Sequence, residues 1–397
     1  RDDGTSKNIR LVDKDHVHTN RLQVINQYVI GTAEGAKHDN RYDVTILVNG
    51  LPLIHVELKR RGVPIREAFN QINRYQRDSF WAASGLYQFV QIFVISNGTH
   101  TKYYSNTTRF AKEEENQQQK QIRCKTESNS FEFTSWWSDE QNNQLPDLRA
   151  FTETFFAKHT ILNILTKYCV FTADKNLLVM RPYQIAATEK ILRRVETAIN
   201  NKWQGTIRAG GYIWHTTGSG KTLTSFKTAQ LCTQLKDVEK VLFVVDRLDL
   251  DYQTMKEYDN FEKDCANSNS DYKILLRQLN DPRCHIIITT IQKLAALLRR
   301  KSEDIKILQA NIVMIFDECH RSQFGKMENH IIFGFTGTPI FAENAVHNKD
   351  SEYTTTAQAF GGEPDDNGNF TRPLHTYTVI DAIKDKNVLR FRVDYVS

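Results

Sequence analysis

The chain has 397 residues, 40% of them hydrophobic and 25% charged, which is an ordinary composition for a globular protein of two domains. Its apolar runs are shorter than the roughly 20 residues that span a bilayer, and its six cysteines are widely spaced without a Cys-x-x-Cys pair. We therefore expect no membrane segment, zinc site or disulfide framework, and a reducing cytoplasm. The net charge of +5 permits a polyanionic partner without establishing one.

The first part of the chain predicts the order strand, strand, helix, strand, strand. Two β-rich runs flank Asn49-Gly50, a dipeptide typical of tight hairpins. Pro64 suits the first turn of a helix, and Asn97-Gly98 separates a second pair of β-rich runs. The predicted elements are strands within 42–59, a helix over 65–80, and strands at 89–96 and 99–104.

The register of the first hairpin decides which acidic and basic side chains share a face. Glu57 and Lys59 are two residues apart, so on a strand they point the same way. A two-residue loop would put Asp43 and Glu57 on opposite faces. A three-residue loop, with Gly50 as a left-handed bulge, would pair Asp43 with His55 and return all three side chains to one face. We predict the bulged loop.

These three side chains suit metal-dependent hydrolysis of a phosphodiester. Asp43 and Glu57 would supply the hard oxygen ligands that Mg²⁺ prefers, and Lys59 would orient or activate the nucleophile. The spacing alone also fits a solvated strand face that carries an ion pair, and at this point that alternative stays open.

The same residues resemble a nuclease family. Asp43 followed by Glu57-Leu-Lys59 resembles the PD-(D/E)xK nuclease core, and Gln71 with Tyr75 resembles the Gln-x-x-x-Tyr element of its RecB-like branch. Gln71 and Tyr75 are four residues apart, so they share one helix face. The resemblance implies a restriction-endonuclease-like α/β domain in which Asp43 and Glu57 bind the metal and Lys59, Gln71 and Tyr75 assist catalysis.

The first domain is predicted to end with a polar stretch followed by a helix. Residues 105–130 predict a loop or a solvated helix, and Trp136-Trp137 favours packing at a domain contact over stacking on bases. A helix over 147–165 is predicted to end the domain. We therefore predict the first domain at 1–168.

Residues 211–222 predict a nucleotide site. An apolar strand end runs into a Gly-rich turn that ends in Lys-Thr, and a helical segment at 223–235 follows. A helix N-terminus binds phosphate through unpaired N–H groups and a partial positive charge. The strand, turn and helix together disfavour an ordinary Gly-rich turn, although His215 stands where the motif usually begins with Gly or Ala. The predicted phosphate-binding residues are Thr217, Gly218, Ser219, Gly220, Lys221 and Thr222, with the Thr222 hydroxyl on Mg²⁺.

Four further strands are predicted to end in polar motifs. The strands are 241–245, 285–290, 311–316 and 333–335, and the motifs are 246–250, 289–293, 317–320 and 336–339. Since such motifs collect at the carboxyl edge of a parallel sheet, we expect the ligand there.

Residues at this edge fit ATP hydrolysis. Asp317 would hold Mg²⁺, and Glu318 would orient and deprotonate the water that attacks the γ-phosphate. His320 would couple hydrolysis to domain motion, together with the threonines of 336–338. The motifs at 246–250 and 289–293 would contact the nucleic-acid backbone, which gives affinity without sequence reading.

In order, these motifs resemble the first RecA-like half of a superfamily 2 helicase, in which Gln184 would read the adenine edge. With the nuclease pattern before them, the chain resembles the motor (R) subunit of type I restriction-modification enzymes. The resemblance implies ATP and Mg²⁺ as cofactors, double-stranded DNA as substrate, and methyltransferase and specificity subunits as partners in a prokaryotic cytoplasm. It also implies a RecA-like P-loop domain at 169–380 and a truncated second one at 381–397.

Two other functions remain open at this level. The first domain could bind DNA without cutting it, in front of a superfamily 2 ATPase. Alternatively, the protein could be a scaffold that binds nucleotide only to dock its partners. We also expect a fragment, because the chain lacks an initiator Met, and a missing loop between His320 and Thr336, where the interval is short.

Overall fold

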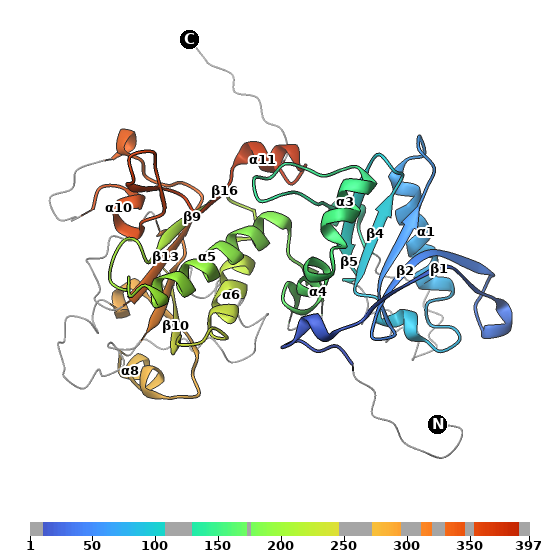
Figure 1. The fold of residues 1–397 in the computed structure, drawn as a ribbon, viewed down its shortest axis with the longest axis horizontal. Coiled ribbons are helices and arrows are strands. Elements are labelled where there is room, and N and C mark those ends of the chain that lie inside the picture. The colour runs from blue at the N-terminus through green and yellow to red at the C-terminus, as the bar shows by residue number, and fades with distance from the viewer. Residues whose placement is uncertain are drawn as a thin grey trace, which may run out of the picture. The chain divides into compact units, whose positions relative to one another are not determined.

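A computed structural model describes residues 11–107, 129–172, 176–245, 272–294, 311–319, 330–345 and 353–388 (Figure 1). The chain divides into two compact units, Arg1–Arg181 and Pro182–Ser397. The division lies beyond the predicted boundary at 168, because unit 1 includes the hairpin of β7 (Cys169–Phe171) and β8 (Leu177–Val179). Thr107 Oγ1 donates to the carbonyl of Leu177 in this hairpin at 3.2 Å. Tyr103 Oη donates to the carbonyl of Met180 at 3.2 Å.

Unit 1 is built on a six-stranded mixed sheet in the order β1-β2-β3-β4-β5-β6. β3 and β4 are parallel and the other neighbours are antiparallel. The parallel pair is joined through helix α1, as a parallel connection requires. The strands are β1 (Leu22–Ile30), β2 (Asn40–Val48), β3 (Leu51–Leu58), β4 (Ile92–Ser96), β5 (Thr101–Ser105) and β6 (Ser135–Trp136).

Helices cover the sheet of unit 1 with aromatic side chains. α1 (Ile65–Asp78) begins after Pro64 and buries Phe69 and Tyr75 in a core with strand residues. The helix predicted over 147–165 is two helices, α3 (Leu148–Phe155) and α4 (Lys158–Thr166). Trp137 packs within unit 1, where its ring lies 5.1 Å from that of Phe155.

The first hairpin differs from the predicted register. Val48 pairs with Leu51, so the loop has two residues, Asn49 and Gly50, both with positive φ. The extra residue lies inside β3 instead, since Ile46 pairs with Ile54 while Leu47 pairs with Pro52. The predicted three-residue loop is therefore wrong.

His55 consequently pairs with Thr45 and not with Asp43. Relative to a regular two-residue hairpin, the observed pairing is shifted by one residue, in the direction opposite to the predicted shift. Continued past Val44 and Val56, it would set Asp43 opposite Glu57. The bulge inside β3 therefore brings Asp43 and Glu57 to one face of the sheet, the result that the sequence predicts from a longer loop.

Unit 2 is built on a six-stranded sheet in which every neighbouring pair is parallel, in the order β11-β10-β12-β13-β9-β16. The predicted parallel sheet is confirmed, and β13 is longer than predicted. The strands are β9 (Gly211–His215), β10 (Lys240–Val245), β11 (Ile286–Thr290), β12 (Ile312–Phe316), β13 (His330–Thr336) and β16 (His375–Tyr377).

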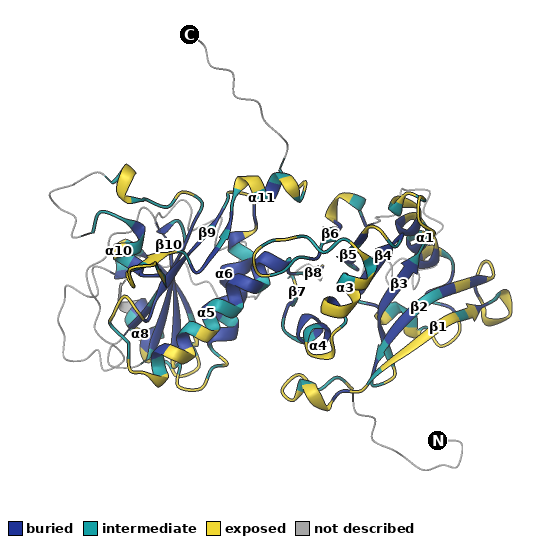
Figure 2. Ribbon diagram, turned by 45° about the horizontal axis from the view of Figure 1, so that its top comes forward, coloured by how far each residue is buried: buried dark blue, intermediate teal, exposed yellow. Residues whose placement is uncertain are grey.

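Helices lie on both faces of this sheet, whose strands are buried (Figure 2). Buried residues of α5 (Pro182–Asn200) and α6 (Lys221–Cys232) form one core with the strands, and those of α8 (Tyr272–Asn280) and α10 (Thr356–Phe360) form the other. Unit 2 also contains a 3-10 helix η7 (Ala342–Asn344), the hairpin of β14 (Glu363–Pro364) and β15 (Phe370–Arg372), and α11 (Val379–Lys384). Among the described helices, none has the length and apolar character needed to cross a bilayer.

Candidate functional sites

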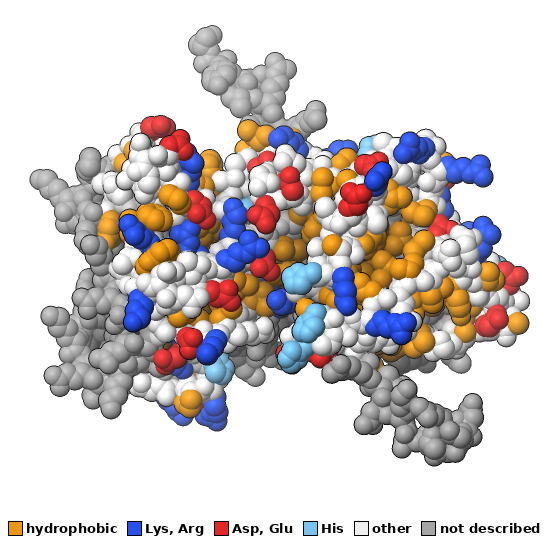
Figure 3. Space-filling model, in the orientation of Figure 1, with side chains coloured by type: hydrophobic (Ala, Val, Ile, Leu, Met, Phe, Trp, Pro, Cys, Tyr) orange, Lys and Arg blue, Asp and Glu red, His pale blue; other side chains and the backbone are white. Residues whose placement is uncertain are grey.

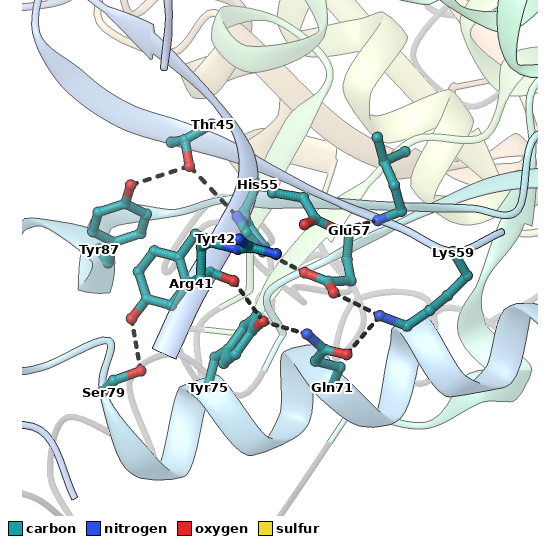
Figure 4. A network of polar contacts seen from close by, with 12 residues as sticks. Arg41, Tyr42, Thr45, His55, Glu57, Lys59, Gln71, Tyr75, Ser79 and Tyr87 are labelled. Carbon is teal, nitrogen blue, oxygen red and sulfur yellow. Dashed lines mark hydrogen bonds and ion pairs between the residues drawn. The ribbon is translucent and has the colours of Figure 1, made fainter. Parts of the chain in front are cut away.

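The candidate site of unit 1 lies at the carboxyl end of β3. Glu57 and Lys59 extend from this end, and α1 presents Gln71 and Tyr75, one helical turn apart, across from them (Figure 4). Asp43 of β2 reaches the same place, where its Oδ2 accepts a hydrogen bond of 2.8 Å from the β3 backbone. The structure therefore brings together all five site residues that the sequence singled out in the first domain.

A chain of hydrogen bonds links these side chains. Lys59 Nζ donates to Glu57 Oε1 at 2.8 Å and to Gln71 Oε1 at 2.5 Å. Gln71 Nε2 donates to the Tyr75 hydroxyl, which donates to the carbonyl of Arg41 at 2.9 Å. An ammonium group has three protons, so a lysine with two such bonds has one more for a phosphate oxygen or a water molecule.

The carboxylates of the site lose hydration on folding, which costs free energy. The Glu57 side chain is 0% exposed, and the side chain of Lys59, its ion-pair partner, is 19% exposed. Burial raises the pKa of Asp43, and the nearby Glu57 carboxylate raises it further. Two ionised carboxylates held close together repel each other, which favours a cation beside them.

The residues present fit a divalent metal ion of the Mg²⁺ type. Glu57 Oε2 is buried, and within the described residues it makes no hydrogen bond. No group of three or more His, Cys, Asp or Glu side chains in the described part of the chain is arranged to hold a metal. Two carboxylates suit Mg²⁺, which keeps several waters and takes further oxygens from phosphate.

Sequence reasoning missed His55, which lies directly behind Glu57. His55 Nε2 is 3.6 Å from Glu57 Oε2, and both side chains are fully buried. The available signal was position, since His55 precedes Glu57 by two residues and so shares its strand face.

The candidate site of unit 2 is the turn between β9 and α6. Gly218 and Gly220 have φ of 78° and 76°, and a Cβ added at Gly218 would meet no atom within 4 Å. α6 begins at Lys221 immediately after this turn. A left-handed Gly-rich turn that is open on one side and ends in a helix N-terminus fits the phosphates of a nucleotide.

Two residues at the start of α5 hold this turn from behind. Tyr183 Oη donates to the carbonyl of Ser219 at 2.7 Å, and Gln184 Nε2 donates to the same carbonyl at 3.1 Å. A Cβ on Gly220 would lie 2.7 Å from Gln184 Nε2. The Gln184 side chain thus contacts the phosphate-binding turn itself, and its reading of adenine remains a prediction.

The acidic motif after β12 lies beside the lysine of the turn. Lys221 Nζ is 3.4 Å from Glu318 Oε1. The backbone N–H of Glu318 donates to Asp317 Oδ1 at 3.0 Å, and Glu318 has a φ of 47°, in the left-handed region. A non-glycine residue in that region is uncommon and occurs at functional sites. Asp317, Glu318 and Lys221 therefore converge at the carboxyl edge of the sheet.

The motif after β13 also contacts the turn. A Cβ on Gly337 would lie 3.2 Å from Thr217 Oγ1, and Trp214 Nε1 donates to the Gly337 carbonyl at 3.2 Å. The N–H of Thr338 is bonded to Thr336 Oγ1 at 3.1 Å. Gly337, between Thr336 and Thr338, therefore lies beside Thr217 of the phosphate-binding turn.

His215, the departure from the usual motif, has a structural explanation. It is fully buried at the end of β9, and its Nε2 is 3.0 Å from Nδ1 of His375 on the neighbouring strand β16. Burial lowers the pKa of His215 well below its ordinary value, and His375 and Lys221 lower it further. The buried pair joins the strand before the turn to the strand before α11.

Some predicted positions lie outside the described residues. They are His320, the motif at 246–250, the polar stretch 108–128, the interval 320–329, and residues 389–397 of the predicted second RecA-like domain. Thr289 and Thr290, from the motif at 289–293, are buried at the end of β11.

Comparisons with known proteins agree with both halves of this description. Residues 183–397 match the family model of the SWI2/SNF2 ATPase, and residues 1–112 match that of the type I restriction enzyme R protein N terminus. The protein is therefore of the class in which a restriction-enzyme N-terminal domain is followed by a SWI2/SNF2-type ATPase. The chain belongs to the family of R (endonuclease) subunits of type I restriction enzymes.

The individual relatives cover different parts of the chain. The SauMSSORF170P endonuclease subunit of Staphylococcus aureus (strain MSSA476) is 40% identical over 100% of this chain and 39% of its own length. The EcoprrI endonuclease subunit of Escherichia coli is 49% identical over 51% of this chain and 58% of its own length. The C-terminal part of the MpnIIP endonuclease subunit of Mycoplasma pneumoniae is 47% identical over 49% of this chain and 97% of that sequence. The chain thus spans about two fifths of its staphylococcal relatives.

Proposed function

We propose that the chain belongs to a subunit that moves double-stranded DNA with ATP and cuts it with Mg²⁺, within a type I restriction complex. The observation that carries this proposal is the presence of two separate anion-handling centres. One is the cluster of Asp43, Glu57 and Lys59 in unit 1, and the other is the turn ending in Lys221 in unit 2.

In cleavage, Asp43 and Glu57 would hold the metal ion, which lowers the pKa of a bound water and neutralises phosphate charge. Lys59 would position the nucleophile or the scissile phosphate through its remaining ammonium proton. Gln71 fixes the direction of that ammonium group, and Tyr75 fixes Gln71. The long side chain of Lys59 is thereby held in one orientation before DNA arrives.

In the motor, residues 217–222 would cradle the phosphates, with Lys221 on the β and γ oxygens. Thr222 and Asp317 would hold the Mg²⁺ of the nucleotide, and Glu318 would orient the attacking water. Thr336 and Thr338 flank Gly337, which lies beside the turn, and would sense the γ-phosphate and relay its loss. Gln184 would recognise adenine next to the same turn.

The partners follow from the family rather than from surface charge. On the face drawn in Figure 3, Lys and Arg side chains are interspersed with Asp and Glu, so net charge alone does not argue for DNA. The relatives are named endonuclease subunits of type I restriction enzymes. We therefore propose methyltransferase and specificity subunits as partners, with the reaction in the cytoplasm of a prokaryote.

The nuclease assignment is tested by exchanging one lysine in the complete, reconstituted enzyme. Lys59→Ala should lower plasmid cleavage with ATP and Mg²⁺ by roughly 100-fold or more, because it removes both bonds that organise the site. Lys37→Ala, at an exposed lysine outside the site, is the matched control and should cut normally.

The same measurement separates the alternatives. Normal cleavage by Lys59→Ala would favour a superfamily 2 ATPase whose N-terminal domain binds DNA without cutting it. A complex that assembles but never nicks DNA in a metal-dependent way would favour the scaffold.

A further inference from the structure

His55 is a buried polar side chain to which the proposed mechanism gives no part. Its ring is 0% exposed and lies among the rings of Tyr42, Tyr75 and Phe80, at centroid distances of 5.5, 5.9 and 5.7 Å. Three edge contacts of this kind fix the plane of an imidazole. Burying a polar ring costs free energy unless its nitrogen atoms have partners, so the partners of His55 are informative.

Each nitrogen of His55 faces one polar atom. Nδ1 is 3.5 Å from Thr45 Oγ1, which is 3.1 Å from the Tyr87 hydroxyl (Figure 4). Nε2 is 3.6 Å from Glu57 Oε2. Neither Nε2 nor Oε2 makes a hydrogen bond within the part of the chain that the structure describes.

These contacts allow a relay of hydrogen bonds from Tyr87 to Glu57. The Tyr87 hydroxyl lies within hydrogen-bond distance of Thr45 Oγ1, at 3.1 Å, and can donate to it. Thr45 can then donate to Nδ1 of His55. An imidazole with one ring proton that accepts at Nδ1 carries that proton on Nε2, and Nε2 is the nitrogen that faces Glu57 Oε2.

Glu57 is therefore approached from two sides. Lys59 Nζ holds Oε1 at 2.8 Å, and His55 faces Oε2. At 3.6 Å the second contact is longer than a hydrogen bond, and polar contacts in an unliganded active site often tighten only in the productive complex. Hydrogen bonds to a metal-ligating carboxylate orient it and tune the affinity for the metal.

We propose that His55 is a positioning residue that donates from Nε2 to Glu57 Oε2 and holds this carboxylate in the orientation that binds the divalent cation. The inference rests on the proposed nuclease function. In addition, the hydrogen-bond relay from Tyr87 through Thr45 to His55 would tune the affinity of the site for the cation, although none of these three residues would contact DNA.

The test measures Mn²⁺ binding to the complete subunit by electron paramagnetic resonance, without nucleotide, in place of Mg²⁺. His55→Leu removes the donor and should weaken binding about 10- to 100-fold. His55→Gln puts an amide N–H near the position of Nε2 and should restore affinity to within about 3-fold of wild type. His100→Leu, the same exchange at an exposed histidine, should have no effect.

A kinetic measurement separates positioning from a merely structural role. In plasmid cleavage, His55→Leu should raise the Mg²⁺ concentration at half-maximal rate and leave the rate at saturating Mg²⁺ close to wild type. Thr45→Val removes only the upstream hydroxyl and should shift Mg²⁺ dependence in the same direction by less. If His55→Leu does not fold, as judged by thermal unfolding, Thr45→Val decides.

The outcomes distinguish this inference from the function on which it rests. Wild-type Mn²⁺ affinity in folded His55→Leu, or equal weakening in His55→Gln, would overturn the role of His55. Wild-type Mn²⁺ binding by Glu57→Ala would instead overturn the nuclease site itself.

Discussion

Glu57 is a buried carboxylate whose nearest partner is a partly exposed lysine. Moving such a pair out of water costs more than the attraction returns in many proteins, so a pair of this kind is weak evidence for stability. Strained or desolvated groups of this type gather at functional sites. The arrangement of Asp43, Glu57 and Lys59 therefore supports the proposed binding of a cation and a phosphate.

This reasoning predicts that Asp43 costs stability. Its pKa is raised in the folded chain, so its contribution to stability is present below the unfolded pKa and is lost as pH rises through the folded one. Asp43→Asn should then raise the midpoint of thermal unfolding of unit 1 at pH 7 to 8 and abolish cleavage. The gain should vanish below about pH 4, which calorimetry over that range can follow.

Asp13→Asn is the matched control for that measurement. A hydrogen bond from the His16 backbone lowers the pKa of Asp13, so the same exchange should lower the unfolding midpoint at neutral pH. A decrease for both variants would contradict the account of Asp43.

The sequence identified some site residues and not others for a physical reason. Glu57 with Lys59, and Gln71 with Tyr75, are local patterns whose spacing fixes a shared face. The position of His55 relative to Glu57 is a local pattern of the same kind, but Thr45 of β2 and Tyr87, which lies before β4, reach His55 from elsewhere in the chain. Such contacts depend on tertiary packing, which no local pattern encodes.

At the scale of the elements, the register of the first hairpin could not be predicted from local sequence patterns alone. The Asn49-Gly50 pair correctly marks the turn, yet the bulge that corrects the register lies inside β3, between Pro52 and Ile54. The helix over 147–165 is broken at Phe156 and Ala157 without a glycine or proline to signal it. By contrast, the parallel sheet of unit 2 was predictable, because each predicted strand of the sequence ends in a polar motif.

The turn of this hairpin gives a prediction at the scale of the element. Gly50 has a φ of 90°, and a Cβ there would meet no atom within 4 Å. Gly50→Ala should therefore destabilise unit 1 through backbone strain alone, by about 1 kcal/mol, as measured by urea unfolding.

Gly31→Ala is a useful comparison for Gly50→Ala. The φ of Gly31 is −120°, which any residue adopts, and a Cβ there would lie 3.0 Å from an oxygen of the Asp39 side chain. Its effect would come from side-chain crowding rather than from backbone strain. No loss of stability in Gly50→Ala would contradict the left-handed turn.

At the scale of the molecule, the two units have separate cores and separate sites. Unit 1 carries the carboxylates and Lys59, and unit 2 carries the phosphate-binding turn and Lys221. Composition and motif order predicted this division, but the position of its boundary depended on the hairpin of β7 and β8. The start of a second RecA-like domain at 381–397 remains a prediction.

The central claim is that one centre cuts DNA and the other drives movement. The most direct test compares Lys59→Ala and Lys221→Ala in the complete enzyme, with translocation followed by triplex displacement and cleavage followed on the same plasmid. Lys221→Ala should lose both activities, whereas Lys59→Ala should translocate at the wild-type rate and fail to cut. Cleavage at the wild-type rate by Lys59→Ala, or loss of translocation in that variant, would contradict the account.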